Sequence, residues 1–370
     1  MNGKIARITA GTAGLVALTA TTVAVSAAAQ AKPMITAARW HVVKRVRSGP
    51  AGDFTAVVAT GQRSGWAFDG NPVAAPISGP TAWRLSGSTW TRAPFPGKHD
   101  EDVVAAAATS RSNVWVFTDV GTGSRVLRWN GRGWAPMRTF GKQIGGASVV
   151  SARDVWVFGR PGVTDQLGDW HYNGRRWSRV AGNLDGGSAL SDANVWAFRG
   201  TSVYHFNGRA WSHTNEARLL PRRSSAGFND PLLTGIYAQS ARSIYAIGNG
   251  NAQDEGGPMV VLRYNGRRWR RVAEGDFGYG TQPSQQIVPD GRGGLWLPMP
   301  GFDGQPSYVL HYFAGTLTKA VLPGGPGGKG IDVESVANVP GSTRMLGAGF
   351  THAAGSQDAR VVGVLLNYGG

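Results

Sequence analysis

The stretch that decides the fold is Ser151-Ala-Arg-Asp-Val-Trp-Val-Phe-Gly159, followed after a loop by His171-Tyr-Asn-Gly-Arg-Arg-Trp-Ser-Arg-Val180. In the first part a polar turn precedes Val-Trp-Val-Phe, which is apolar on both alternations and is typical of a strand buried on both faces. The second part holds Asn-Gly between two apolar runs, which predicts a hairpin with a type I′ turn and positive φ at both residues. The stretch therefore predicts three antiparallel strands.

The same pattern recurs along the chain and predicts a repeat protein. Copies of the apolar strand are Gly65-Trp-Ala-Phe68, Val114-Trp-Val-Phe117, Val195-Trp-Ala-Phe198, Ile244-Tyr-Ala-Ile247, Leu295-Trp-Leu-Pro298 and a divergent Arg344-Met-Leu-Gly347. Copies of the hairpin begin at Arg84, Leu127, His205, Arg263 and His311. A run of small residues upstream of each apolar strand adds a further strand, so each unit should hold four.

The two ends of the chain predict how the units close. The last unit ends at Leu365-Leu-Asn-Tyr-Gly-Gly370, without the Arg-Arg-Trp strand that should follow. A strand of that type lies near the N-terminus instead, as Ala38-Arg-Trp-His-Val-Val43. We expect this strand to pair with the C-terminal hairpin and close a ring of seven units. The expected units are 51–95, 102–138, 144–180, 184–213, 232–272, 281–322 and 331–370, the last completed by 38–46.

Together these features predict an all-β, seven-bladed β-propeller of four-stranded blades spanning residues 32–370. The repeated Val-Trp-x-Phe and Asn-Gly-x-x-Trp motifs resemble those of secreted actinobacterial propellers, distantly similar to kelch and WD-repeat propellers. The resemblance covers nearly everything after residue 38 and implies a fold without implying an activity. Two smaller sandwiches are the alternative, but they would leave the split unit unexplained.

The first residues read as a secretory signal peptide, 1–31. Lys4 and Arg7 precede an uncharged run, and Ala29-Gln-Ala31 has the small residues of a cleavage site after Ala31. A retained membrane anchor is the alternative. We expect a cleaved, secreted chain, extracellular or associated with the cell wall, with no transmembrane span in its mature form.

The charge of the chain favours anionic partners. The whole sequence carries +16, from 38 Lys and Arg against 22 Asp and Glu. Without two signal cations the mature form has 36 minus 22, or +14, which attracts anions over long range. A simple contribution to solubility is the alternative. Cysteine is absent, so packing alone must hold the fold.

The resemblance implies that the loops between second and third strands, and between blades, share one face where propellers usually bind ligands. Acidic and aromatic residues of these loops are suited to a sugar, and ordinary turn chemistry is the alternative. The ligand-binding candidates are Asp100, Asp102, Asp230, Asp276, Tyr279 and Asp303.

Arginines after the Asn-Gly turns should project from the opposite face. They could bind cell-wall phosphate polymers or other polyanions by bidentate contacts, or could simply be solvated above tryptophan surfaces. The anion-binding candidates are Arg132, Arg175, Arg176, Arg209, Arg267 and Arg268.

No metal site, cofactor or catalytic residue is predicted. His171, His205 and His311 share one repeat position, which arginine occupies in other units, so we interpret it as a polar strand position. The leading hypothesis is a monomeric, non-catalytic secreted propeller that binds a glycan or an anionic cell-envelope polymer through its long-loop face, with no nucleic acid expected. The alternatives are an extracellular glycoside hydrolase or polysaccharide lyase using loop carboxylates, and a protein-interaction scaffold.

Overall fold

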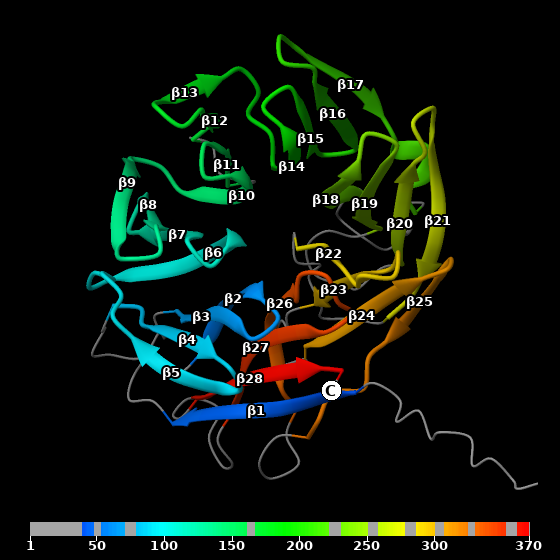
Figure 1. Cartoon of the computed structure of the whole chain (residues 1–370). Coiled ribbons are helices and arrows are strands. Elements are labelled where there is room, and N and C mark those ends of the chain that lie inside the picture. Colours follow the sequence, from blue (N-terminus) through cyan, green and yellow to red (C-terminus); the bar gives the residue numbers. More distant parts are fainter. Residues whose placement is uncertain are drawn as a thin grey trace, which may run out of the picture. The chain divides into compact units, whose positions relative to one another are not determined.

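The structure is a computed structural model that describes residues 39–47, 53–70, 79–160, 167–221, 231–250, 258–277, 286–299, 307–324, 330–352 and 361–369. Seven four-stranded antiparallel sheets form the blades of a propeller (Figure 1). The unit Ala38–Gly370 contains all seven. Within the residues that the structure describes, no helix has the length and apolar character needed to cross a membrane.

The blades follow one another in chain order, and each runs from an inner strand at the centre of the ring to an outer strand at its rim (Figure 1). Blade 1 is β2 (Phe54–Gly61), β3 (Ser64–Asp69), β4 (Ala82–Ser86) and β5 (Thr89–Ala93). Blade 2 is β6 (Glu101–Ser110), β7 (Asn113–Val120), β8 (Gly123–Trp129) and β9 (Trp134–Phe140). Blade 3 is β10 (Ile144–Ser151), β11 (Asp154–Gly159), β12 (Asp169–Tyr172) and β13 (Trp177–Val180).

The remaining blades have the same order. Blade 4 is β14 (Gly186–Ser191), β15 (Asn194–Arg199), β16 (Ser202–Phe206) and β17 (Trp211–Asn215), and a 3-10 helix, Ala217–Leu219, follows it. Blade 5 is β18 (Leu232–Ser240), β19 (Ser243–Asn249), β20 (Met259–Tyr264) and β21 (Trp269–Gly275). Blade 6 is β22 (Val288–Pro289), β23 (Leu295–Met299), β24 (Tyr308–Phe313) and β25 (Thr316–Lys319). Blade 7 is β26 (Asp332–Asn338), β27 (Met345–His352), β28 (Val361–Tyr368) and β1 (Trp40–Arg47).

The ring closes as the sequence predicts. β1 pairs antiparallel with β28, from Trp40 opposite Tyr368 to Arg47 opposite Val362, and thereby becomes the outer strand of blade 7. The Trp40 ring lies 5.6 Å from that of Trp296 in blade 6. The strand near the N-terminus thus supplies the tryptophan that the C-terminal hairpin lacks.

The second strand of each blade forms the core between blades. Trp156 is fully buried and its ring lies 5.5 Å from Phe206 and 6.4 Å from Trp211 of the next blade. The same contact joins Trp196 to Trp269, whose centroids are 6.1 Å apart. The tryptophan in the second strand of one blade therefore packs against the tryptophan in the outer strand of the next blade. This contact explains why both tryptophans recur in the sequence repeat.

The Asn-Gly turns are hairpins, but their predicted type I′ geometry is wrong. In blade 3 the positive φ (+87°) falls on Gly174 and not on Asn173. Instead Asn173 Oδ1 accepts hydrogen bonds from the backbone N–H groups of Arg175 (3.1 Å) and Arg176 (3.0 Å). The side chain replaces a backbone acceptor, so only the glycine needs a left-handed φ. Positive φ at both central residues occurs in the divergent blade 6 hairpin, at Ala314-Gly315.

Candidate functional site

The inner strands begin on the face that carries the connections between blades, here called the long-loop face. On three adjacent blades a carboxylate stands at or near that start. Asp53 directly precedes β2 of blade 1, Asp102 is the second residue of β6 of blade 2, and Asp332 and Glu334 lie on β26 of blade 7. Strand β2 contacts both β6 and β26, so these residues share one part of the ring.

A cavity of about 340 Å³ lies along these inner strands. Small residues leave this space open, because they place little or no side chain on the inner surface: Ala105, Ala106, Gly145, Gly146, Ala147 and Gly187. Of the described residues that line the cavity, Glu334 is the charged one. Asp53, Asp102 and Asp332 each stand two residues before a residue that lines the cavity, namely Thr55, Val104 and Glu334. We call these three aspartates together with Glu334 the channel mouth.

The electrostatics of the channel mouth show that its carboxylates interact. Burial raises the pKa of Glu334 to about 7, and the negative charges of Asp332 and Asp53 add to the effect. Burial also raises the pKa of Asp53, and Asp102 adds to it. Asp53 Oδ1 is buried and accepts no hydrogen bond. A cationic group placed here would relieve the repulsion between these carboxylates.

The predicted ligand residues are placed unevenly. Asp102 contributes to the channel mouth, whereas Asp100 has a positive φ of +62° and pairs with His99 at 3.0 Å on the surface. Asp276 follows β21 and is exposed. Asp230, Tyr279 and Asp303 lie outside the described residues.

Other acidic groups serve the scaffold. Glu101, next to Asp102 in sequence, is fully buried and pairs with Arg125 at 2.5 Å. Asp169 is also fully buried, and its carboxylate accepts the backbone N–H groups of Asn183 and Leu184, both at 3.1 Å. Burial nevertheless raises the pKa of Asp169 to about 7.

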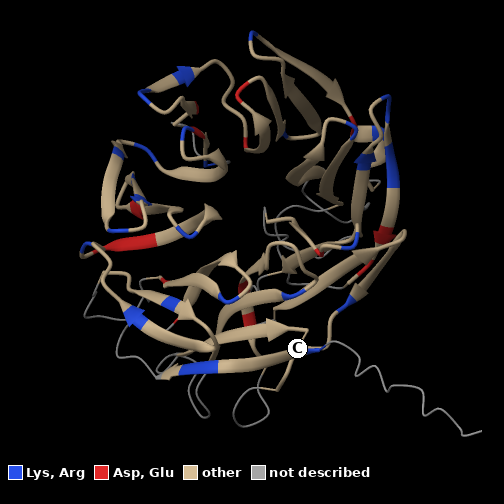
Figure 2. Ribbon diagram, in the orientation of Figure 1, with Lys and Arg blue, Asp and Glu red and all other residues tan. Residues whose placement is uncertain are grey.

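The predicted anion-binding arginines are exposed and belong to equivalent turns of four blades. Figure 2 shows basic residues spread around the ring rather than gathered in one patch. Arg132, the pair Arg175 and Arg176, and Arg209 therefore lie on three separate blades. Arg267 and Arg268 differ, because both line a cavity on the outer side of blades 4 and 5.

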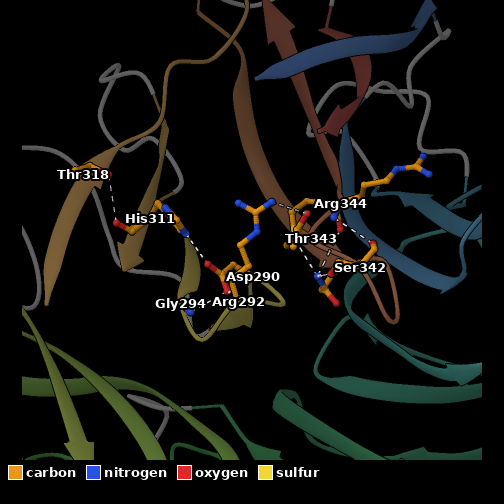
Figure 3. A network of polar contacts seen from close by, with 10 residues as sticks. Asp290, Arg292, Gly294, His311, Thr318, Ser342, Thr343 and Arg344 are labelled. Carbon is orange, nitrogen blue, oxygen red and sulfur yellow. Dashed lines mark hydrogen bonds and ion pairs between the residues drawn. The ribbon is translucent and has the colours of Figure 1, made fainter. Parts of the chain in front are cut away.

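The repeated histidines make stacking and polar contacts within their own blades. His171 stacks on Trp156 with centroids 4.4 Å apart, and its Nε2 lies 2.9 Å from Asp154 Oδ1. Figure 3 shows the blade 6 equivalent, in which His311 Nε2 lies 2.9 Å from Asp290 Oδ2. In the described ranges, no group of three or more histidine or acidic side chains is arranged to hold a metal ion.

Sequence reasoning missed Asp53, Asp332 and Glu334 at the channel mouth. Asp53 stands alone before an apolar strand, and Asp332 and Glu334 alternate with apolar residues of β26, without the run of charges that singles out Asp102. The available signal was the repeat position that Asp53, Asp102 and Asp332 share, at the beginning of the small-residue strand.

Comparison with known proteins gives the fold. No protein-family model matches the chain, and no curated protein matches it. Solved structures do match. "YCF48 bound to D1 peptide" is 12% identical with a TM-score of 0.53, covering 90% of this chain and 97% of that one. "Structure of U3-55K" and "Crystal structure of RRP9 WD40 repeats" are each 10% identical, with TM-scores of 0.55 and 0.54, and each covers 87% of this chain and 97% of its own. The chain is a seven-bladed β-propeller with WD40-like structural neighbours.

Proposed function

We propose that this protein is a non-catalytic binding propeller that takes a ligand with a cationic group, such as a basic peptide segment, at the channel mouth. The observation that carries the proposal is the electrostatic interaction of carboxylates from three adjacent blades, one of which, Glu334, lines the cavity, in a chain whose net charge is +16. A cleft of one sign with low-dielectric walls focuses its field on the opposite charge. The neighbour whose title names a bound peptide supports a binding role for this class of fold.

The same carboxylates disfavour an anionic envelope polymer on the long-loop face, because like charges would repel it. A neutral glycan remains compatible with carboxylates as hydrogen-bond acceptors. Its aromatic platform would have to include Tyr279, which lies outside the described residues.

We also propose export of the chain, with a leader removed after Ala31. Mass spectrometry of the secreted protein should then find Lys32 as the first residue.

A calorimetric titration with a hexalysine peptide tests the cationic ligand. Since the pKa of Glu334 is about 7, its carboxyl is charged at pH 8 and neutral at pH 5. Affinity should therefore fall about ten-fold between pH 8 and pH 5, as one close charge contact is lost. Glu334→Gln should bind at pH 8 as weakly as the unmodified protein does at pH 5. Equal affinity for hexaglutamate, or a Glu334→Gln variant with unchanged affinity, would refute the proposal.

Glycoside hydrolysis is the second candidate, favoured by the pKa of Glu334. A carboxyl with a pKa of about 7 close to other carboxyl groups can act as the general acid of a carboxylate pair. Release of reducing ends from a panel of polysaccharides, abolished in Glu334→Gln, would replace the binding proposal with this one. No release from any of them would leave the channel mouth as a binding site.

A further inference from the structure

A second cavity, of about 350 Å³, lies between the outer part of blade 4 and the β20–β21 hairpin of blade 5. It shares no lining residue with the cavity along the inner strands. Trp196 and Trp269 line it but are each only 7% exposed, and Glu216 is only 5% exposed. The groups that a ligand can reach are therefore the exposed polar side chains of the lining.

Three of these exposed side chains are arginines from two different segments. Arg218 lies on the 3-10 helix that follows blade 4, and Arg267 and Arg268 lie on the turn between β20 and β21. None of the three forms an ion pair with a carboxylate among the described residues. Each guanidinium therefore keeps its planar fork of donors free for an oxyanion.

The turn that carries two of the arginines has a fixed shape. Asn265 Oδ1 accepts the backbone N–H groups of Arg267 at 3.0 Å and Arg268 at 3.1 Å. Arg175 and Arg176 of blade 3 lie on a turn held in the same way, yet they do not line this cavity. What distinguishes the turn of blade 5 is the segment that stands beside it.

That segment is the 3-10 helix, and a side chain of blade 5 holds it in place. Arg271 donates from Nε to Leu219 O and from Nη2 to Leu220 O, both at 2.8 Å. These bonds join the end of the helix to the same β-strand that the arginine turn precedes. Arg218 is therefore held on one frame with Arg267 and Arg268, and little ordering is needed when an anion binds.

Blade 4 adds hydroxyl groups to the cavity. On β17, Ser212 lies opposite His205 and Thr214 lies opposite Val203, and all four residues line the cavity. Cross-strand partners share one face of a sheet, so both hydroxyl side chains lie on the face that borders the cavity. Both residues are exposed, and a hydroxyl can donate to an oxyanion.

We propose that this cavity binds a phosphate group, carried either by a small phosphate ester or by a linear phosphate polymer. The three arginines pair with its charged oxygens, and the hydroxyl of Ser212 or Thr214 donates to a remaining one. A carboxylate has two oxygens in one plane, whereas a tetrahedral phosphate directs its oxygens toward donors that come from both segments and from β17. Phosphate is therefore favoured over a carboxylate of equal charge.

Isothermal titration calorimetry on the full chain tests this assignment with two pairs of probes. Glycerol 3-phosphate is compared with malate, and linear polyphosphate with hexaglutamate. In at least one pair the phosphate probe should bind about ten-fold more tightly, because one more hydrogen bond between charged groups contributes about that factor. The pair that shows the difference identifies the source as a small ester or a polymer. Carboxylates that bind as tightly as phosphates in both pairs, or no binding of either phosphate probe, would overturn the proposal.

A double substitution separates the cavity from general positive charge. Arg267→Ala/Arg268→Ala should lose at least about ten-fold in affinity for the phosphate probe. Arg175→Ala/Arg176→Ala is the matched control, because it removes the same charge from the same turn positions of blade 3. The control should change affinity by less than about two-fold, since salt screens distant exposed charges. Equal losses in both variants would show that only net charge matters and would contradict the site.

Two further variants test the separate segment and the separate cavity. Arg218→Ala should lose at least about five-fold in phosphate affinity, because it removes the cation of the 3-10 helix. Unchanged affinity would contradict a site built from two segments. Glu334→Gln alters the channel mouth and should change phosphate affinity by less than about two-fold, so the two proposals can fail independently. If the double variant fails to fold, the loss in Arg218→Ala decides the question.

Discussion

Trp156 illustrates how one side chain holds two blades together. It is fully buried, it stacks on His171 of its own blade, and it contacts Phe206 and Trp211 of the next. Its Nε1 has no hydrogen-bond partner among the described residues. The contribution of Trp156 is therefore packing alone.

Trp156→Ala should lower the free energy of unfolding by about 3–5 kcal/mol, the usual cost of truncating a buried large aromatic residue. Reversible urea denaturation followed by fluorescence measures it. Phe313→Ala is a control, because Phe313 is 46% exposed, and it should change stability by less than about 0.5 kcal/mol. A loss below about 1 kcal/mol in Trp156→Ala would mean that the blade interface tolerates the cavity.

At the scale of the element, the two glycines of one Asn-Gly turn differ in whether the backbone requires them. In blade 2, Gly131 has a φ of +95°, and a Cβ there would come within 2.9 Å of the Ser112 Cβ. Gly133 in the same turn has nothing within 4 Å, and Ala210 occupies its position in blade 4. Only the first glycine is therefore required by the backbone.

Gly131→Ala should destabilise the protein by about 1–2 kcal/mol, the cost of a side chain in a left-handed conformation. Gly133→Ala should be neutral or stabilise by up to about 1 kcal/mol, because it restricts the unfolded chain without straining the turn. Differential scanning calorimetry of the pair measures both effects. Equal destabilisation by the two substitutions would contradict the assignment of the turn.

The elements could be predicted from the sequence because each carries its own local signal. The Val-Trp-x-Phe strands and Asn-Gly hairpins repeat often enough to predict the four-stranded blade. They also predict the seam, where the strand near the N-terminus pairs with the C-terminal hairpin. The turn type was wrong because a side-chain hydrogen bond by Asn173 replaces the backbone geometry that Asn-Gly usually adopts. The channel mouth could be predicted only at Asp102. Asp53 and the pair Asp332 and Glu334 belong to blades that meet only when the ring closes, so a shared position in the repeat does not by itself show that these residues lie together.

The whole molecule depends on the pairing of β1 with β28. Without β1, the backbone of β28 becomes an open sheet edge, and the rings of Trp296 and Tyr368 lose the Trp40 ring that packs 5.6 and 5.4 Å from them. An uncovered edge with apolar neighbours also favours association between molecules. The seam is therefore the position at which removing one strand affects the entire ring.

Deleting residues 1–47 should lower the melting temperature by on the order of 10 °C, because it removes a core tryptophan and a full ladder of hydrogen bonds. A deletion of residues 1–37 is the matched control, since it retains β1, and it should melt within about 2 °C of the full chain. A synthetic peptide of residues 38–47, added to the shorter protein, should raise its melting temperature in a concentration-dependent manner, because it binds the folded state only. Identical melting of the two truncated proteins would refute closure of the ring by β1, whereas rescue by the peptide would show that strand pairing at the seam, and not covalent continuity, holds blades 6, 7 and 1 together.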